Sequence, residues 1–168
     1  MKRIGLFYGK NTVKTAIIAK KIQDAFGNVK IELISIEEAW QKDFEAYDFL
    51  IAGASTWFDG ELPSYWDEII PELSTLDLKD KKIAIFGLGD QVNYPDNFVD
   101  GIGLLAKAFE TAGAKLVGST SVDGYHFNQS QAMNSEHFAG LAIDIENQPE
   151  KTDERIRDWV KKLKKEFL

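Results

Sequence analysis

Short apolar runs alternate with amphipathic segments along the whole chain. The apolar runs predict five strands, at residues 3–8, 30–36, 49–54, 82–87 and 115–119. The segments between and after them predict helices at residues 15–26, 65–73, 98–112 and 152–167. Because the strands are apolar on both faces and alternate with helices, we expect a parallel sheet covered by helices on each side.

Three of these segments carry further signals. The predicted helix at 15–26 has an apolar stripe of Ala16, Ile17, Ala19, Ile22 and Phe26. Gly113 is placed to end the helix at 98–112, since glycine often follows a helix carboxyl end. Pro71 leaves the length of the helix at 65–73 open, because proline interrupts helices.

Residues 120–136 break the alternation, being polar and without a clear period. A second short apolar run at 138–143 follows. We therefore expect the fifth strand to be split by an excursion of roughly 20 residues, longer than ordinary connections. A partner-docking segment and a structural filler explain this excursion equally well.

These patterns predict an α/β fold: a three-layer, doubly wound sandwich with a five-stranded parallel sheet whose fifth strand is split by an insertion. Residues 1–168 are expected to form one domain. The chain has no cysteine, which excludes disulfides, thiolate metal ligands and a cysteine nucleophile. The apolar run at the amino terminus is too short for a signal peptide or a membrane span, so we expect a cytoplasmic protein without a membrane partner.

The formal net charge of −7 argues against a nucleic-acid partner, because Lys and Arg bind phosphate backbones. The acidic residues are concentrated after the third and fourth predicted strands and again near residue 145. They are Asp59, Glu61, Asp67, Glu68, Glu72, Asp90, Asp96, Asp100, Asp144 and Glu146. An acidic rim around a ligand site would steer basic partner proteins. A merely solvated acidic surface would give the same pattern.

Two aromatic residues stand in loops that follow buried strands. Trp57 lies in the loop at 55–60 and Tyr94 in the loop at 87–97, each beside turn-forming residues. In an open parallel sheet, ligands bind beyond the carboxyl ends of the strands, where such loops converge. Lone aromatics are often core residues, but the turn residues favour a pair that stacks on the two faces of a flat ring.

The residues near this pair suit the edge of an isoalloxazine. Asp90, next to Gly89, can accept a ring N–H, and backbone N–H groups can bind ring carbonyls. Gly60 lets the preceding peptide take either orientation, since positive φ costs glycine little. A carbonyl turned toward flavin N5 can accept its proton, a bond worth about 1 kcal/mol, or roughly 40–60 mV for one electron.

The loop at 9–15 joins the first strand to the first helix, and a helix amino terminus suits a phosphate. Thr12, Thr15 and Asn11 can add side-chain hydrogen bonds there. A simple N-cap cluster is an equally good explanation, because Asn and Thr are favoured at helix starts. The loop fits neither a Walker loop nor a dinucleotide fingerprint, since the required glycines are missing.

Several stretches together resemble a flavodoxin of the long-chain type, over essentially the whole chain. They are Ile4-Gly5-Leu6-Phe7-Tyr8-Gly9 with Asn11-Thr12 and Lys14-Thr15; Thr56-Trp57 with Gly60-Glu61-Leu62; Phe86-Gly87-Leu88-Gly89-Asp90-Gln91; Tyr94-Pro95-Asp96-Asn97-Phe98; Asp123-Gly124-Tyr125 with Phe127; Gly140-Leu141-Ala142 with Asp144; and Asn147-Gln148 with Thr152-Asp153-Glu154-Arg155. Their order and spacing are specific to that family. The excursion resembles the insertion that separates long from short flavodoxins.

The resemblance implies a flavodoxin-like sheet and one non-covalent FMN. It implies a phosphate site formed by Lys10, Asn11, Thr12, Val13, Lys14 and Thr15. Trp57 and Tyr94 would cover the two ring faces. One ring edge would be lined by Ser55, Thr56, Phe58 and Gly60, and the other by Leu88, Gly89, Asp90 and Asn97. Glu146 would lie near the ribityl chain.

Three positions depart from the family pattern. Relatives usually carry Ser or Thr where Lys10 stands, Gly where Val13 stands and proline where Ser55 stands. Lys10 loses a hydroxyl but brings a charge near the phosphate, and Val13 requires ordinary backbone angles. We expect phosphate binding to persist.

By this resemblance the chain is an electron-transfer protein and not an enzyme. It is expected to be a low-potential one-electron carrier that moves between the semiquinone and hydroquinone states of FMN. The expected partners of this monomer are basic-faced redox proteins, such as a flavodoxin or ferredoxin reductase or another oxidoreductase. No catalytic residue and no metal are expected.

The alternative is an NAD(P)H-dependent FMN or quinone reductase of flavodoxin-like fold. That enzyme needs an open ring face for the nicotinamide, whereas Trp57 and Tyr94 are expected to take both faces. A response-regulator receiver shares the sheet topology but needs acidic residues where Tyr8-Gly9 and Ala54-Ser55 stand.

Overall fold

The computed structural model of the chain describes residues 2–57 and 60–168. Its main sheet is parallel, with strands in the order β2-β1-β3-β4-β5 and with β9 also paired to β4. The strands are β1 (Ile4–Tyr8), β2 (Ile31–Ser35), β3 (Phe49–Ser55), β4 (Lys82–Leu88), β5 (Lys115–Val117) and β9 (Leu141–Ile143). The predicted parallel sheet is confirmed.

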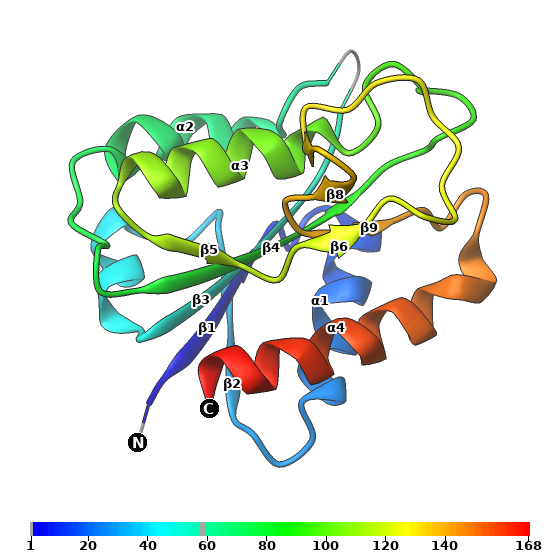
Figure 1. Cartoon of the computed structure of the whole chain (residues 1–168). Helices are drawn as coiled ribbons and strands as arrows, with labels where there is room; N and C mark the ends of the chain where they lie inside the picture. The colour runs from blue at the N-terminus through cyan, green and yellow to red at the C-terminus, as the bar shows by residue number, and fades with distance from the viewer. Residues whose placement is uncertain (1, 58–59) are drawn as a thin grey trace.

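Helices cover both faces of this sheet. They are α1 (Val13–Ala25), α2 (Ser64–Leu73), α3 (Asp100–Thr111) and α4 (Thr152–Phe167). Helices α2 and α3 lie together on one face and α1 and α4 on the other, which confirms the three-layer, doubly wound fold (Figure 1). Two 3-10 helices, η1 (Gln41–Ala46) and η2 (Pro149–Lys151), are too short to show a period in the sequence. Within the described ranges, no helix has the length and apolar composition needed to cross a bilayer.

The fifth strand is split, as predicted. β5 pairs with the first half of β4, where Lys115 lies beside Lys82, and β9 pairs with its end, where Ile143 lies beside Leu88. The excursion between them forms a small antiparallel sheet of β6 (Thr120–Ser121), β8 (His137–Phe138) and β7 (Met133–Asn134), in that order. Two-residue strands are too short for a period, so the sequence showed only a polar segment.

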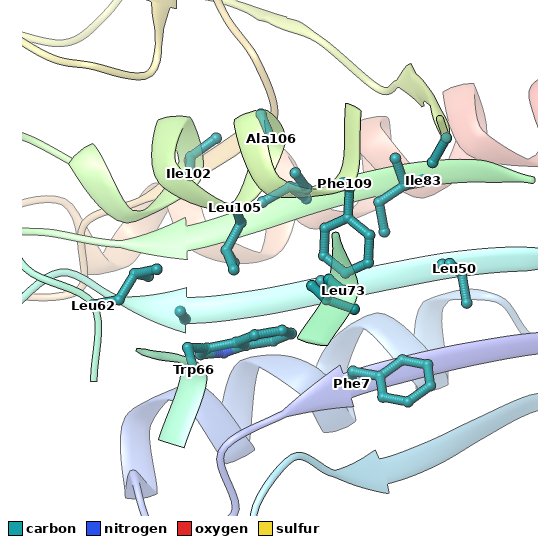
Figure 2. Packing of buried hydrophobic residues seen from close by; sticks show 14 of the residues in the cluster. Phe7, Leu50, Leu62, Trp66, Leu73, Ile83, Ile102, Leu105, Ala106 and Phe109 are labelled. Atoms are coloured by element: carbon teal, nitrogen blue, oxygen red, sulfur yellow. The ribbon is translucent and has the colours of Figure 1, made fainter. Parts of the chain in front are cut away.

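Two apolar cores fill the space between the sheet and its helices. On one face, Phe7 and Leu50 from the strands face Trp66 of α2 and Phe109 of α3 (Figure 2). Trp66 is fully buried, and its indole N–H donates to the carbonyl of Gly53 at 3.2 Å. Burying each such large side chain stabilises the fold by about 1.5–3 kcal/mol, so the strands are held firmly under the loops that follow them.

The buried face of α1 differs from the predicted stripe. Ile17, expected inside, is 49% exposed, whereas Ile18 is buried. Thr15 is also buried, because its hydroxyl is hydrogen-bonded to that of Ser55 at 2.8 Å. A partnered hydroxyl can enter the core, and this rotates the helix so that positions 15, 18, 19 and 22 face inward.

The helices begin and end only partly where the sequence predicts. α3 begins at Asp100, two residues later than predicted, because Val99 has a φ of 47° and cannot belong to the helix. Gly113, with a φ of 98°, follows its end as predicted. Pro71 does not end α2; its position is exposed, so the carbonyl that loses its partner can bind water.

Tyr125 attaches the excursion to the sheet. Its hydroxyl donates to the carbonyl of Ala142 in β9 at 2.6 Å, and its ring meets that of Phe138 edge-on. The Arg155 guanidinium lies over the Tyr125 ring, with its Cζ 3.9 Å from the ring centroid. Burial raises the pKa of Tyr125 to about 12, which the positive charge of Arg155 only partly offsets.

We predict that Tyr125 makes stability fall at alkaline pH. The folded state holds this proton more tightly than an unfolded tyrosine, whose pKa is 10.0. The contribution is therefore complete below pH 10 and is lost as pH rises toward about 12. Denaturant unfolding over this range should show the loss, and Tyr125→Phe should reduce the pH dependence. An equal pH dependence in the two proteins would contradict this assignment.

Candidate functional site

An open cleft of about 200 Å³ lies where β3, β4 and β9 end and α1 begins. Its lining comes from loops far apart in sequence: Lys14, Ser55, Thr56, Leu88, Gly89, Asp90, Tyr94, Asn97, Ile145 and Glu146. In the strand order observed, β1 lies between β2 and β3, so the chain winds outward in both directions from this region. Ligands of open α/β sheets bind at such a point, beyond the carboxyl ends of the strands.

All of these lining residues except Ile145 were predicted from the sequence as residues of the cofactor site. Ile145 lies two residues after the end of β9, between Asp144 and Glu146, and its place beside these two predicted residues was the signal that could have identified it. Other predicted residues lie in the adjoining segments instead: Asn11, Thr12 and Thr15 around the start of α1, and Trp57 and Gly60 in the turn after β3. Lys10 and Val13 line a separate surface of α1. Phe58 lies outside the described residues.

Trp57 begins a tight turn that closes on Glu61. The two residues exchange backbone hydrogen bonds at 2.7 and 2.8 Å. Gly60 within the turn has a φ of 95°, and a Cβ there would come within 2.5 Å of the Asp100 carboxylate. Trp57 is 37% exposed, and its ring meets the Tyr65 ring edge-on. Trp57 is thus held by its backbone directly after Thr56 of the cleft wall and is not a core residue.

Tyr94 lies in the loop after β4 and is 52% exposed. Its N–H donates to the carbonyl of Asp90 at 2.9 Å, which folds the loop on itself. The excursion supports the loop, because Asn128 and Gln129 both donate backbone N–H groups to the carbonyl of Pro95, at 2.7 and 2.9 Å. These contacts give the excursion a visible structural role behind the Tyr94 loop.

The Asp90 carboxylate organises the same loop. Its Oδ1 accepts hydrogen bonds from the backbone N–H groups of Val92 and Asn93 and from the amide of Asn147, at 2.8 to 3.1 Å. Partial burial opposes ionisation, but hydrogen bonds from Asn93, Asn147 and Val92 outweigh it and lower the pKa of Asp90. Asp90 therefore places a negative charge on the cleft wall. Its Oδ2, which accepts from the side chain of Asn93, is the oxygen with capacity for a further donor.

Asp144, at the end of β9, is fully buried. Its Oδ2 accepts from the backbone and side-chain nitrogens of Gln91, at 3.1 and 2.7 Å, and its Oδ1 accepts from the backbone of Asn147 at 3.0 Å. A buried carboxylate is tolerated only with such partners. This network joins the ends of β4 and β9 and fixes both walls of the cleft.

The first turn of α1 is open to an acceptor. Thr12 precedes the helix without a side-chain cap, and the backbone N–H groups of Val13, Lys14 and Thr15 have no acceptor among the described residues. Val13 adopts helical angles, as expected for a residue that disfavours positive φ. Unpaired N–H groups at the positive end of a helix are an oxyanion site.

Side chains around this turn are held in place by hydrogen bonds. The Thr12 hydroxyl lies 2.9 Å from the Tyr65 hydroxyl, and Tyr65 fills the space above Gly9, where a Cβ would come within 2.2 Å of its ring. The ammonium of Lys10 pairs with the carboxylate of Glu38. That hydrogen bond raises the pKa of Lys10.

Lys14 and Glu146 form an ion pair across one end of the cleft. Both side chains are about half exposed, so this pair contributes little stability and can open at low cost. The cleft therefore extends from Tyr94 and from Thr56, next to Trp57, to a helix start whose first N–H groups have no acceptor in the described part of the chain. Among residues 2–57 and 60–168, no group of His, Cys, Asp and Glu is arranged to hold a metal ion.

Known proteins share both the sequence and the shape of this chain. The family model described as Flavodoxin matches residues 6–159. A flavodoxin of Nostoc sp. is 46% identical over 166 residues, which cover 99% of this chain and 98% of that protein. A flavodoxin of Synechococcus elongatus is also 46% identical, and the alignment covers 99% of both chains.

A solved structure gives the same result. The crystal structure of Fusobacterium nucleatum flavodoxin bound to flavin mononucleotide superposes with a TM-score of 0.94, at 33% identity and with 100% of both chains covered. The chain belongs to the flavodoxin family.

Proposed function

We propose that this protein binds one FMN non-covalently in the cleft and carries single electrons between redox proteins. The observation that carries this conclusion is the cleft itself, which is lined by the exposed Tyr94 and by Thr56, the neighbour of the exposed Trp57, and which reaches Lys14 at the uncapped start of α1. A ligand with a flat ring and a phosphate tail fits this arrangement, because the ring can stack on the aromatic side chains and the phosphate can accept hydrogen bonds at the start of α1. When bound, the isoalloxazine supplies the redox chemistry, and the protein supplies binding and electrostatics.

The start of α1 fits the phosphate. The N–H groups of Val13, Lys14 and Thr15 can donate to its oxygens. Burial raises the pKa of Tyr65 although its hydrogen bond to Thr12 opposes the change, so Tyr65 keeps its proton. Tyr65 can therefore donate to Thr12, which leaves the Thr12 proton for the phosphate. The phosphate would therefore be bound mainly by uncharged donors, namely backbone N–H groups and a hydroxyl.

The loops after β3 and β4 fit the ring. Trp57 and Tyr94 would stack on its two faces, each contact worth about 0.5–1.5 kcal/mol beyond the area buried. Both side chains are exposed enough to do so. Thr56, Leu88, Gly89 and Asn97 line the cleft and would approach the ring edges. The ionised Asp90 opposes the addition of negative charge to the ring, which favours a low reduction potential.

The exposed rim suits electron transfer between proteins. Tyr94 and Val92 are more than half exposed beside the cleft, so a partner can approach the ring edge directly. Glu146 lines the cleft, Glu61 pairs with Trp57 and Asp96 lies in the Tyr94 loop, and these negative charges favour partners with basic faces. We propose a monomer of one domain with such partners. A reductase is not favoured, because stacking by Trp57 and Tyr94 leaves no ring face for a nicotinamide.

A stepwise reductive titration of the FMN complex tests this function. We expect two well-separated one-electron midpoint potentials, since fixed negative charge at the cleft makes the second electron harder to add. NADPH alone should not reduce the complex. A single two-electron step, or rapid reduction by NADPH without another protein, would instead support the reductase.

Trp57→Ala and Tyr94→Ala should each weaken FMN binding. We expect a loss of about 1–3 kcal/mol, roughly 5- to 150-fold in Kd, from stacking and burial together. Quenching of FMN fluorescence on titration with the apoprotein measures this loss. Trp40→Ala is the matched control, because Trp40 is 69% exposed and lies directly before η1, outside the loops that follow β3 and β4. Unchanged Kd values for both variants would contradict the stacking role.

Gly60→Ala should lower both the stability of the apoprotein and its affinity for FMN. The new side chain would be strained by the φ of 95° and would clash with Asp100 beside the cleft. Gly27→Ala is the control, since Gly27 has a φ of 65° but open space around it. That variant should lose about 1–2 kcal/mol of stability from strain alone and bind FMN normally. Equal behaviour of the two variants in FMN binding would show that Gly60 has no special role.

A further inference from the structure

The loop before α1 already holds an anion from within the chain. The backbone N–H groups of Lys10 and Asn11 donate to the two carboxylate oxygens of Glu37, at 3.0 and 2.9 Å. The Ser35 hydroxyl donates to the same carboxylate at 3.2 Å. Glu37 lies just beyond β2, which pairs with β1, so the loops after these two strands are neighbours. A carboxylate bound to successive backbone N–H groups shows that the loop binds oxyanions.

Glu37 and the adjacent Glu38 contact the loop before α1 through different groups: Glu37 binds its backbone N–H groups, and Glu38 binds a side chain. Glu38 pairs with the side chain of Lys10, so a cation neutralises its charge. Glu37 forms no salt bridge among the described residues; its carboxylate accepts hydrogen bonds from N–H and hydroxyl groups, and the Lys10 ammonium acts on it only through its charge. The two neighbouring carboxylates thus provide an internal comparison between occupying backbone donors and merely adding charge.

The donors that Glu37 occupies adjoin those left open in the next turn. Lys10 and Asn11 precede Thr12, and the N–H groups of Val13, Lys14 and Thr15 follow it without acceptors among the described residues. Only Thr12 separates the two sets of donors, so an anion on the helix start and the Glu37 carboxylate would draw on neighbouring N–H groups. Each N–H serves one strong acceptor well, and two anions at one loop repel each other.

We propose that Glu37 is a resident competitor for the cofactor phosphate, an inference that rests on the proposed function. Without FMN, its carboxylate holds the loop through the N–H groups of Lys10 and Asn11. With FMN, the phosphate reaches those two donors only when Glu37 withdraws. Glu37 therefore lowers the affinity for FMN while having no effect on a flavin that lacks the phosphate.

The test compares the apoprotein with Glu37→Gln and with the matched control Glu38→Gln. FMN, riboflavin and inorganic phosphate are the probes; fluorescence quenching gives Kd for the flavins, and the rise in Tm reports phosphate. Glu37→Gln should bind FMN roughly tenfold more tightly, the equivalent of one charge-assisted hydrogen bond. It should bind riboflavin unchanged and gain a larger rise in Tm with phosphate. Glu38→Gln should change FMN binding much less.

Several results would overturn this role. FMN binding that is unchanged or weaker in Glu37→Gln would make Glu37 a support for the loop and not a competitor. An equal gain in both variants would reduce the effect to net charge, and an equal gain for riboflavin would remove the link to phosphate. Failure of all three proteins to bind either flavin would contradict the proposed function instead. The phosphate measurement would then decide the role of Glu37 by itself.

Discussion

The register between β3 and β4 is the constraint on which the cleft depends. In this register Ser55 lies beside Leu88, so both strands end at the same level. The Thr56 N–H then donates to the carbonyl of Leu88 at 3.1 Å, which continues the pairing one residue into the loop. The loops that carry Trp57 and Tyr94 therefore leave the sheet side by side. A slip of one residue would turn every buried side chain of β3 to the other face, so the cores on both faces oppose it.

Polar groups behind the cleft keep its loops in place before any ligand binds. The buried Asp144 ties the loop after β4 to the end of β9 through Gln91, and Asp100 accepts from the backbone of Gln131 in the excursion at 2.7 Å. The Thr56 hydroxyl accepts from the N–H of Gly101 at the start of α3. Binding loops built this way lose little conformational entropy when they close on a ring. The start of α1 differs, because part of it is engaged by Glu37.

The sequence predicted the elements that have strong patterns and missed those set by tertiary contacts. Strands apolar on both faces and the long helix at 152–167 were correctly placed, as was the split of the fifth strand. The inward face of α1 was misjudged because Thr15 enters the core through its bond to Ser55, a contact between distant residues. The contacts of Lys10 with Glu38 and of Glu37 with the loop before α1 could not be predicted from the sequence either. They join two loops that follow different strands, β1 and β2. The cleft residues could be predicted from the sequence, because strand ends and turn-forming residues indicate where they lie.

A crystal structure of the protein with FMN tests the central claim most directly. We expect the isoalloxazine between Trp57 and Tyr94, with the phosphate within hydrogen-bond distance of the N–H groups of Val13, Lys14 and Thr15. A ring bound elsewhere, such as on the exposed surface of α1 around Ile17, would contradict it. So would a ring in the cleft with either aromatic side chain turned away.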